Sequence, residues 1–339
     1  MGLLETGLGS RARALRVAQW VFRESDPRSA PPEALPGVNR AAWNVFREHW
    51  PLPSVQMIES NPSPIDRTTK YIIAFGSIAV ETVLIQNATR STVCISSQAG
   101  CSRHCAFCAT AKLGLKRNLT ADEMVCQYLI ASRYAPLHAP ARNVVFMGMG
   151  EPMDNLESVL ETVTVLCQSP SPQLAASQVT VSTSGIVPSL VKFLRCSKAS
   201  LALSLNATTD AQRDWLMPQN RQWPIASLIA ALREDQVVHP RRIYFIEYVM
   251  FRGFNDQIED ANRLVKLLMG LTARVNLIPY NPGSCKQLNL SPPQNDQVTA
   301  FQHRVQKQGI RCMVRWPRGG DIAAACGQLA LRSAQEQRA

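Results

Sequence analysis

From residue 92 onward, short apolar runs alternate with amphipathic helical stretches, and this alternation constrains the fold more than any other feature. The runs span Val93–Ser96, Asn143–Met147, Val179–Ser182, Leu201–Leu205, Ile243–Val249, Val275–Ile278 and Cys312–Trp316. One helical stretch opens with the capping box of Thr120 and Glu123. Others are predicted near 156–166, 188–195, 224–234, 257–269 and 295–308. Repeated strand–helix units predict an α/β fold built on a parallel sheet or barrel.

The chain before this repeat has a different pattern. Residues 1–66 contain two helical stretches, around Trp20 and Trp43, separated by a proline-rich segment, and they predict a small helical module. Tyr71–Phe75 and Val80–Ile85 are β-rich and flank a turn at Gly76, which predicts a β-hairpin extension over residues 67–91. The barrel core is then expected at 92–332, followed by a short tail at 333–339.

Composition narrows the class of protein. The net charge of +11 favours a polyanionic partner such as nucleic acid, although a generally basic surface is the alternative. Ten cysteines without an export signal favour reduced thiols and metal binding over a disulfide framework. No apolar run approaches the ~18 residues that span a bilayer. We therefore expect no membrane association and a cytoplasmic location.

Polar residues follow several of the apolar runs at the point where each run ends. In parallel α/β folds the functional residues lie at the carboxyl ends of the strands. A single polar residue there is usually part of a turn, but several in register predict a site. They are Cys94–Ser97, Gly148–Glu151, Ser182–Ser184, Ser204–Asn206 and Asn281.

A C-x3-C-x2-C triplet, Cys101, Cys105 and Cys108, follows the first of these strand ends. Three thiolates can hold three corners of a cubane iron–sulfur cluster, whereas ordinary electron-transfer clusters are closed by four cysteines. The fourth iron then has an open position, which is typical of a catalytic site. Structural zinc is the alternative, but zinc needs a fourth ligand, and the adjacent His104 is poorly placed to supply it.

The triplet resembles that of the radical S-adenosylmethionine (SAM) superfamily, and longer motifs resemble one branch of it. These motifs are CISSQAGCSRHCAFCAT, GLKRNLTADE, NVVFMGMGEPMDN, VTVSTSGIVPSL, LSLNATTDAQRDWLMPQN, VNLIPYNP and DIAAACGQL. Together they are similar to the RlmN/Cfr family of RNA adenine methyltransferases, from about residue 70 to 330. The resemblance implies a radical SAM partial (βα)6-type barrel, preceded by the helical module and the hairpin extension.

The resemblance also implies an activity. The expected reaction is methylation of carbon 2 of an adenine in 23S rRNA, with tRNA as a further substrate. That carbon is electron-poor and does not attack the methyl group of SAM directly. The family instead methylates an enzyme cysteine with one SAM and uses a second SAM to generate a radical. Cys326 matches the methyl-carrying cysteine, and Cys94 matches the cysteine that resolves the protein–RNA crosslink and leaves a disulfide.

Further residues carry over by the same match. Glu81 corresponds to an acidic active-site residue, although an exposed glutamate on a strand face is the alternative. The [4Fe-4S] cluster is assigned to Cys101, Cys105 and Cys108. SAM is expected to contact Gly150, Glu151, Ser182, Ser204, Leu205, Asn206 and Asn281, with Glu151 taking its ammonium group.

Partners are implied less specifically. RNA phosphates are expected near Arg103, His104, Lys112, Lys116, Arg117, Arg311, Arg315 and Arg318. A reducing donor such as flavodoxin or ferredoxin is expected to supply electrons, and the protein is expected to be a monomer.

Three alternatives remain open on the sequence. They are methylation at carbon 8, as in the Cfr branch; a radical SAM enzyme with another substrate; and a catalytically silent RNA-binding paralogue. The chain departs from the family pattern at Asn206, where many relatives have His, and at Gly320, where Asp is usual. The second departure lies on the segment that carries Cys326.

Overall fold

A computed structural model describes residues 9–26, 28–49, 55–168, 172–282 and 290–331. Its centre is a ten-stranded sheet with the order β1-β2-β3-β4-β7-β8-β9-β10-β11-β12. The strands β4 (Ser91–Cys94), β7 (Ala141–Phe146), β8 (Val179–Thr183), β9 (Ser200–Ser204), β10 (Tyr244–Met250), β11 (Ala273–Pro279) and β12 (Arg311–Val314) pair in parallel. The order is linear, so β1 and β12 do not close on each other. The expected partial barrel is therefore confirmed.

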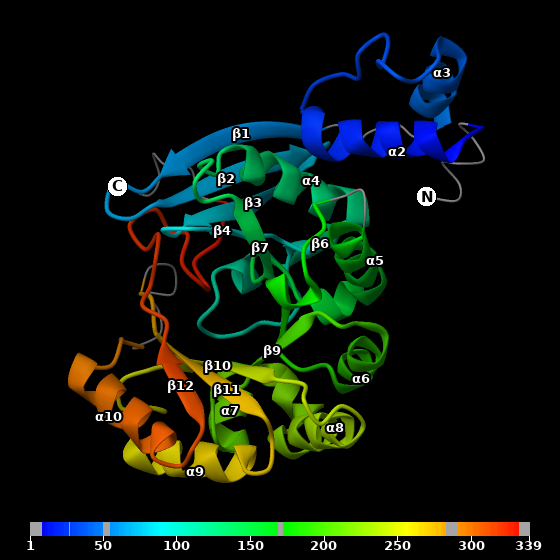
Figure 1. Cartoon of the computed structure of the whole chain (residues 1–339). Helices are drawn as coiled ribbons and strands as arrows, with labels where there is room; N and C mark the ends of the chain where they lie inside the picture. The colour runs from blue at the N-terminus through cyan, green and yellow to red at the C-terminus, as the bar shows by residue number, and fades with distance from the viewer. Residues whose placement is uncertain (1–8, 27, 50–54, 169–171, 283–289, 332–339) are drawn as a thin grey trace.

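Helices connect the parallel strands and lie along the outside of the curved sheet (Figure 1). They are α4 (Ala121–Arg133), α5 (Leu156–Cys167), α6 (Val187–Cys196), α7 (Asp210–Leu216), α8 (Ile225–Val238), α9 (Ile258–Leu268) and α10 (Asn295–Gln306). The predicted capping box begins α4: the Glu123 amide donates to Thr120 Oγ1 at 3.3 Å, and the Thr120 amide donates to Glu123 Oε2 at 2.9 Å. None of the helices in these described ranges has the length and apolar character needed to cross a membrane.

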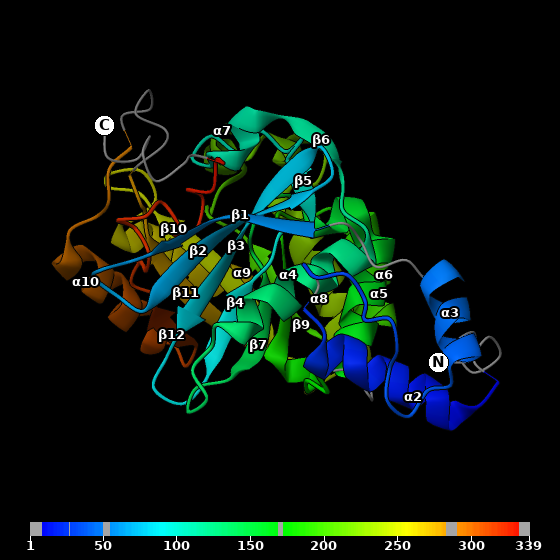
Figure 2. The ribbon, with the colours of Figure 1, turned by 90° about the horizontal axis from the view of Figure 1, so that it is seen from above.

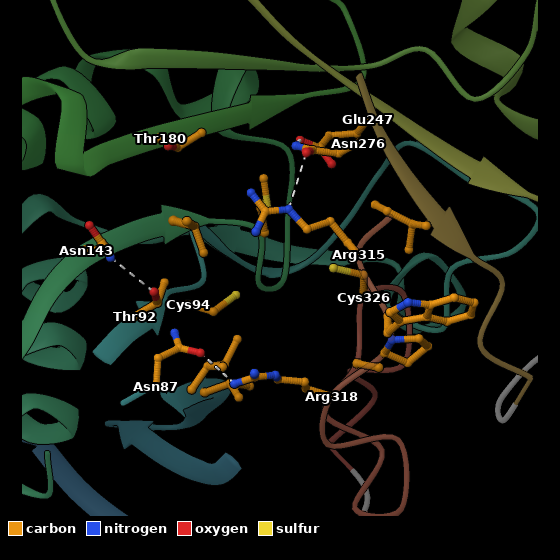
Figure 3. A pocket seen from close by; sticks show the side chains of 18 of the residues that line it. Asn87, Thr92, Cys94, Asn143, Thr180, Glu247, Asn276, Arg315, Arg318 and Cys326 are labelled. Atoms are coloured by element: carbon orange, nitrogen blue, oxygen red, sulfur yellow. Dashed lines mark hydrogen bonds between the residues drawn. The ribbon is translucent and has the colours of Figure 1, made fainter. Parts of the chain in front are cut away.

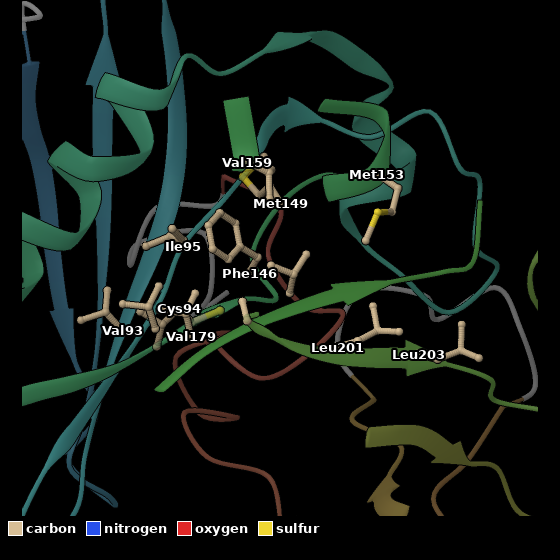
Figure 4. Packing of buried hydrophobic residues seen from close by; sticks show 14 of the residues in the cluster. Val93, Cys94, Ile95, Phe146, Met149, Met153, Val159, Val179, Leu201 and Leu203 are labelled. Atoms are coloured by element: carbon tan, nitrogen blue, oxygen red, sulfur yellow. The ribbon is translucent and has the colours of Figure 1, made fainter. Parts of the chain in front are cut away.

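Between the sheet and its helices lies one large apolar core. Figure 4 shows part of it, with Val93 and Ile95 from the β4 region, Phe146 at the end of β7, and Leu201 and Leu203 of β9 packed together. These five side chains are 2% exposed or less. Burial on this scale fixes the strands, and therefore fixes where their carboxyl ends place the polar residues that follow.

The N-terminal helices form a separate, smaller core. The helix α2 (Arg11–Gln19) continues into a short π-helical turn, Trp20–Glu24, and α3 (Arg40–His49) packs against it. Trp20 and Trp43 meet edge to face with their ring centroids 5.1 Å apart. Both helices project to one side of the molecule (Figure 2). The predicted helical module is thus present, at residues 11–49.

The extension beside the barrel has three strands instead of the expected two. The predicted hairpin is β2 (Thr68–Phe75) and β3 (Ile78–Gln86), which pair antiparallel. A further strand, β1 (Val55–Pro62), pairs antiparallel with β2 on the outer edge. The sequence pattern assigns residues 55–62 to the helical module. This assignment is wrong, because these residues form a strand. The sequence of β1 does not alternate polar and apolar residues, and only one face of the strand is covered.

Candidate active site

The cysteine triplet lies on the loop that follows β5 (Gln98–Gly100), beyond the carboxyl end of β4. A short strand, β6 (Leu115–Asn118), pairs with β5 and closes this loop at its base. Gly100 has a φ of +84°, and a Cβ there would stand 1.7 Å from the carbonyl oxygen of Gly114. Only glycine allows this close approach of the two backbone segments, so Gly100 fixes the start of the loop.

Two distant segments of the chain hold the cysteine loop from outside. The amide of Ala106 donates to the carbonyl oxygen of Leu216, at the end of α7, at 2.9 Å. The amide of Ala109 donates to the carbonyl oxygen of Gly327 at 2.7 Å. Because Gly327 follows Cys326 directly, this second bond ties the methyl-carrier candidate to the cysteine loop.

The three thiols of the loop disfavour one another's ionisation. Burial raises the pKa of Cys101 to about 12, and the nearby Cys108 thiol adds to the rise. Burial also raises the pKa of Cys105 well above its usual value, with further contributions from Cys108 and Cys101. A donor set of this kind becomes a set of thiolates only when it binds a cationic group, because a nearby positive charge lowers the pKa of a thiol.

The arrangement fits an iron–sulfur cluster better than a single ion. Among the described residues, no three Cys, His, Asp or Glu side chains are grouped as they would be around one metal ion. The corners of a cubane are separate iron atoms, so its thiolate ligands need not meet at a point. Phe107 packs against Phe251, with the ring centroids 5.5 Å apart, and gives the loop an apolar wall beside Cys105.

Glu151, the expected ammonium partner, is buried at the end of the β7 segment. Its carboxylate accepts hydrogen bonds from Thr183 Oγ1 (2.7 Å), the Met153 amide (3.0 Å), the Ser184 amide (2.8 Å) and Ser184 Oγ (2.7 Å). Burial raises the pKa of the carboxyl, and these hydrogen bonds act against the rise. Four bonds meet the acceptor capacity of a carboxylate, so a ligand ammonium would have to replace one of them.

Gly150, the neighbouring position expected to contact SAM, has a positive φ of +101°. A Cβ there would stand 2.6 Å from the Cβ of Gln98, so the backbone at this edge approaches its neighbour too closely for a side chain.

The other residues expected to contact the cofactor differ in the burial and the hydrogen bonding of their side chains. Ser182 and Ser204 end adjacent parallel strands, and their hydroxyl oxygens lie 3.4 Å apart. Leu205 is fully buried. Asn206 is 1% exposed, and its Oδ1 accepts from the Val249 amide at 2.9 Å. Asn206 therefore braces the backbone, which is a structural use of the position where many relatives have His.

Cys94 and Cys326 line the same cavity, although they stand at opposite ends of the barrel sequence (Figure 3). The cavity has a volume of about 770 Å³, and Asn281 lines it as well. Glu81 and the other residues expected to hold the cluster or to contact SAM do not line it. The structure thus brings together the two cysteines that the motifs single out for methyl transfer and one expected cofactor residue in a single space.

The two cysteines of the cavity differ in accessibility. Cys94, at the end of β4, is 8% exposed, and burial together with the nearby Cys326 thiol raises its pKa strongly. Cys326 is exposed to solvent through the cavity. The surrounding walls nevertheless raise the pKa of Cys326 to about 11, and Glu247 and Cys108 add to the rise. The cavity walls therefore favour the uncharged form of the Cys326 thiol.

A polar cluster on the cavity wall was not expected from the sequence. Glu247 on β10 and Asn276 on β11 are register partners in the parallel sheet. Asn276 Nδ2 donates to Glu247 Oε1 at 2.7 Å, and Arg315 Nε donates to Asn276 Oδ1 at 3.2 Å. Burial raises the pKa of Glu247 to about 7. The available signal was a polar residue inside each of two neighbouring apolar strands.

The segment that carries Cys326, residues 315–331, is called the C-terminal loop below. It crosses from β12 to the inner face of the three-stranded extension. Hydrogen bonds to distant residues hold it: Arg318 Nη1 to Gln86 O (3.0 Å), the Gly319 amide to Asp66 Oδ2 (2.8 Å), Ser63 Oγ to Asp321 Oδ2 (2.9 Å) and Thr110 Oγ1 to Leu329 O (2.8 Å).

Gly320, the second departure from the family pattern, has open space around it. A Cβ at this position would meet no heavy atom within 4 Å, and the residue has no positive φ. The absence of a side chain here therefore leaves the course of the C-terminal loop unchanged.

Glu81 lies on β3 and is fully buried, so the alternative of an exposed glutamate is wrong. Its Oε1 forms an ion pair with Lys70 Nζ at 2.9 Å, and both side chains are 1% exposed or less. Its Oε2 accepts from the Leu331 amide at 3.2 Å. Glu81 thus ties the extension to the end of the C-terminal loop, and it does not line the cavity of Cys94 and Cys326.

Four of the eight basic residues expected to bind RNA fall into two groups. Arg103 pairs with Asp154, and Arg117 pairs with Glu123, so carboxylates of the chain already neutralise these two guanidinium groups. Arg315 and Arg318 line the cavity instead, on either side of the half-exposed Trp316. The second group has the better position for phosphates near the reactive cysteines.

Comparison with known proteins gives matches over nearly the whole chain. Residues 95–265 match the family model described as the radical SAM superfamily. The chain is 40% identical to a dual-specificity RNA methyltransferase RlmN from Anaeromyxobacter sp. (strain Fw109-5), over 96% of this chain and 87% of that protein. It is 38% identical to the protein of the same name from Geotalea uraniireducens, over 94% and 90% of the two chains. Its fold matches a radical SAM methyltransferase from Sphaerobacter thermophilus with a TM-score of 0.88, at 36% identity and 96% coverage of each chain.

Proposed function

Because the chain belongs to the RlmN family of radical SAM RNA methyltransferases, we propose that it methylates carbon 2 of an adenine in 23S rRNA and in tRNA. The proposal includes a methylated cysteine as an intermediate, two molecules of SAM per turnover, and the same roles for Cys326 and Cys94 that the sequence motifs imply.

The observation that supports the proposal most is the shared cavity. Cys94 and Cys326 come from opposite ends of the barrel sequence and face one space of about 770 Å³. A structural role requires neither cysteine to reach this space, because apolar neighbours of the same size pack equally well. A two-cysteine mechanism does require it, because one sulfur has to displace the other from a product carbon.

The chain's own groups then have defined tasks. Cys326 accepts a methyl group and becomes an S-methyl thioether. After a hydrogen atom is removed, its methylene carbon bonds to carbon 2 of the adenine, and the adduct then gives up one electron, which a bound cluster would accept, and the hydrogen of carbon 2 as a proton. Cys94 attacks the sulfur of Cys326, which forms a disulfide and breaks the bond between that sulfur and the product carbon, and this carbon takes up a proton to become the methyl group. Reduction of the disulfide returns both thiols for the next cycle.

Cys101, Cys105 and Cys108 would hold a [4Fe-4S] cluster, which supplies, together with SAM, the radical that removes the hydrogen atom. In the proposal SAM contacts the residues that the sequence motifs imply, which are Gly150, Glu151, Ser182, Ser204, Leu205, Asn206 and Asn281. A reducing partner such as flavodoxin or ferredoxin supplies the electrons. The enzyme is proposed to act as a cytoplasmic monomer.

The target adenine has to leave its stack to reach this cavity. Trp316 is 53% exposed, lines the cavity and lies between Arg315 and Arg318 in the sequence. An exposed indole provides a stacking surface for an unstacked base, and the two guanidinium groups provide partners for the adjoining phosphates. In the proposal these residues hold the strand while its adenine enters.

The test is mass spectrometry of nucleosides from rRNA and tRNA of a deletion strain and its complemented strain. We expect 2-methyladenosine to disappear on deletion and to return on complementation. Loss of 8-methyladenosine instead would show carbon 8 chemistry at the same site. An unchanged set of methyladenosines would reject this substrate class and favour another radical SAM substrate.

A further inference from the structure

The cavity wall opposite the two cysteines carries a buried carboxylate whose role is not explained by the proposed mechanism. Glu247 is 6% exposed and lies on β10, between β9 and β11. Its Oε1 accepts from Asn276, while its Oε2 has no hydrogen-bond partner among the described residues. The residue lines the same cavity as Cys326. Because Oε2 is not one of the buried oxygens without a partner, it is open to the cavity and accessible to a proton donor there.

Asn276 and Arg315 hold this carboxylate in one orientation. Arg315 Nε donates to Asn276 Oδ1, so the amide has to present its Nδ2 to Glu247. A carboxylate held at one oxygen by an oriented amide keeps the other oxygen facing the cavity (Figure 3). Two adjacent parallel strands and the C-terminal loop each supply one member of this chain of hydrogen bonds.

Cys326 is close enough to Glu247 for their charges to interact. The carboxylate of Glu247 raises the pKa of this thiol, and both side chains line the same cavity, so the two groups share one electrostatic environment. The other titratable or charged groups that line the cavity are Arg90, Cys94, Arg315 and Arg318, and the Cys108 thiol also raises the pKa of Cys326. Glu247 is the strongest base of this set, because the three arginines are cationic and an uncharged thiol is a weak proton acceptor.

We propose that Glu247 is the base that accepts the proton of Cys326 when this thiol is methylated, and that Asn276 and Arg315 position it. This step rests on the proposed function. The S–H proton moves to a carboxylate oxygen, the sulfur forms a bond to the methyl carbon of SAM, and the bond between that carbon and the sulfonium breaks. S-adenosylhomocysteine leaves, so charge and electrons balance. Glu81 takes no part in the step, because Lys70 and Leu331 already engage its carboxylate.

The acidities of the two groups agree with this geometry. A thiol with a pKa of about 11 is almost entirely protonated at neutral pH. A carboxyl with a pKa of about 7 is half ionised there and is a stronger base than an ordinary glutamate. Once it takes the proton it no longer carries the negative charge that opposes thiolate formation.

The experiment measures two reactions of Cys326 in the full-length, cluster-loaded enzyme. The first is S-methylation by SAM with a deuterated methyl group, in the absence of reductant and RNA. The second is alkylation by iodoacetamide in the absence of SAM. Peptide mass spectrometry follows both between pH 5.5 and 9.5. For the native enzyme we expect both rates to rise to a plateau with a midpoint near pH 7.

Glu247→Gln should lower both rates at pH 7 by about a hundredfold, the effect of losing a general base. Its rates should then rise without a plateau up to the highest pH. A carboxylate that only repelled the thiolate would have the opposite effect, because its removal would increase the ionised fraction of Cys326. Unchanged or faster reactions of Glu247→Gln would therefore overturn the proposal. Glu157→Gln, at an exposed carboxylate on α5, is the matched control and should behave as the native enzyme.

A second variant keeps the test decisive if Glu247→Gln does not fold. Asn276→Ala keeps the carboxylate but removes its hydrogen-bond donor, which acts to lower the pKa of Glu247. The midpoint of both pH profiles should move upward. A midpoint that stays in place would also overturn the proposal. Iodoacetamide alkylation requires neither SAM nor RNA, so this result is independent of the nucleoside analysis that tests the proposed function.

Discussion

The loop of the cysteine triplet and the C-terminal loop, which carries Cys326, are held in place by different kinds of interaction. The cysteine loop after β5 is fixed at its base by local contacts, through Gly100, Gly114 and the short β5–β6 pair. The C-terminal loop contains local turns, such as the one closed by the Ala324 amide and Gly319 O at 2.8 Å, but no strand pair fixes its base. Bonds to Ser63, Asp66, Glu81 and Thr110, all far away in the sequence, hold it against the extension and the cysteine loop. The first loop is a local motif, and the second depends on the completed fold.

The largest expected effect separates the chemistry of these two loops. Cys326→Ala should abolish RNA methylation while leaving the iron content unchanged, because Cys326 is not one of the three cluster ligands. Cys105→Ala should abolish methylation and also lower the iron content. Iron analysis and methyl transfer from labelled SAM measure the two properties. Equal loss of iron in both variants would contradict the separate roles.

Cys94→Ala tests whether the cavity has two reactive sulfurs. Without the second thiol, the bond between Cys326 and the product carbon should persist, because no sulfur is available to displace it. Turnover should fall by at least about a hundredfold, and an enzyme–RNA adduct should accumulate. Denaturing gel electrophoresis with labelled RNA detects the adduct. Normal turnover without an adduct would remove Cys94 from the mechanism.

Lys70→Met tests how strongly the extension and the C-terminal loop depend on one buried ion pair. Removing the lysine leaves Glu81 buried without its cation, and such breaks typically cost about 3–5 kcal/mol. The free energy of unfolding, measured by urea denaturation, should fall by that amount. The double variant Lys70→Met/Glu81→Gln should recover much of the loss, because it removes the uncompensated charge. A single variant as stable as the native protein would exclude a strong pair.

The buried carboxyl of Glu247 should make stability depend on pH. Its folded-state pKa, about 7, lies above the ordinary value of 4.5, so the folded state binds the proton more tightly. The stabilisation is therefore complete below about pH 4.5 and is lost as the pH rises through about 7, by roughly 3 kcal/mol in total. Glu247→Gln should flatten this part of the profile of unfolding free energy against pH. A native profile without such a slope would show that the carboxyl stays ionised.

The smallest effect is expected at Gly320. The open space around it predicts that Gly320→Asp changes the free energy of unfolding by less than about 0.5 kcal/mol, as surface substitutions usually do. Methylation should stay within about twofold of the native rate. The neighbouring Gly319→Asp is the contrast, because its φ is +64° and a Cβ would stand 2.9 Å from Thr68 and Ala324. Equal effects of the two substitutions would contradict the described course of the C-terminal loop.

The comparison of the two loops also explains how much of this molecule its sequence predicts. The parallel strands, their order of appearance and the capping box at Thr120 follow from local periodicity, and they are confirmed. The cysteine triplet and the link between Cys94 and Cys326 rest on motifs, which preserve chemistry even across long separations. The strand β1 was missed because an edge strand has only one covered face and a weak apolar pattern.

Two features could not be predicted because they depend on side chains that meet only in the folded chain. The Lys70–Glu81 pair forms across neighbouring strands, in a region where the sequence allows a solvent-exposed glutamate. The Glu247–Asn276–Arg315 cluster requires the register of β10 with β11 and the return of the chain after β12. Neither register nor loop return is encoded in a local pattern.

The linear order of the sheet has a consequence for damaged chains. Because β1 and β12 remain apart, the C-terminal loop is the segment that reaches the extension, and it is also the segment that carries Cys326. A chain shortened by premature termination or by proteolysis after β12 keeps all three cysteines of the triplet but lacks Cys326, the proposed methyl acceptor. Loss of this final stretch should therefore give an enzyme that is silent toward RNA.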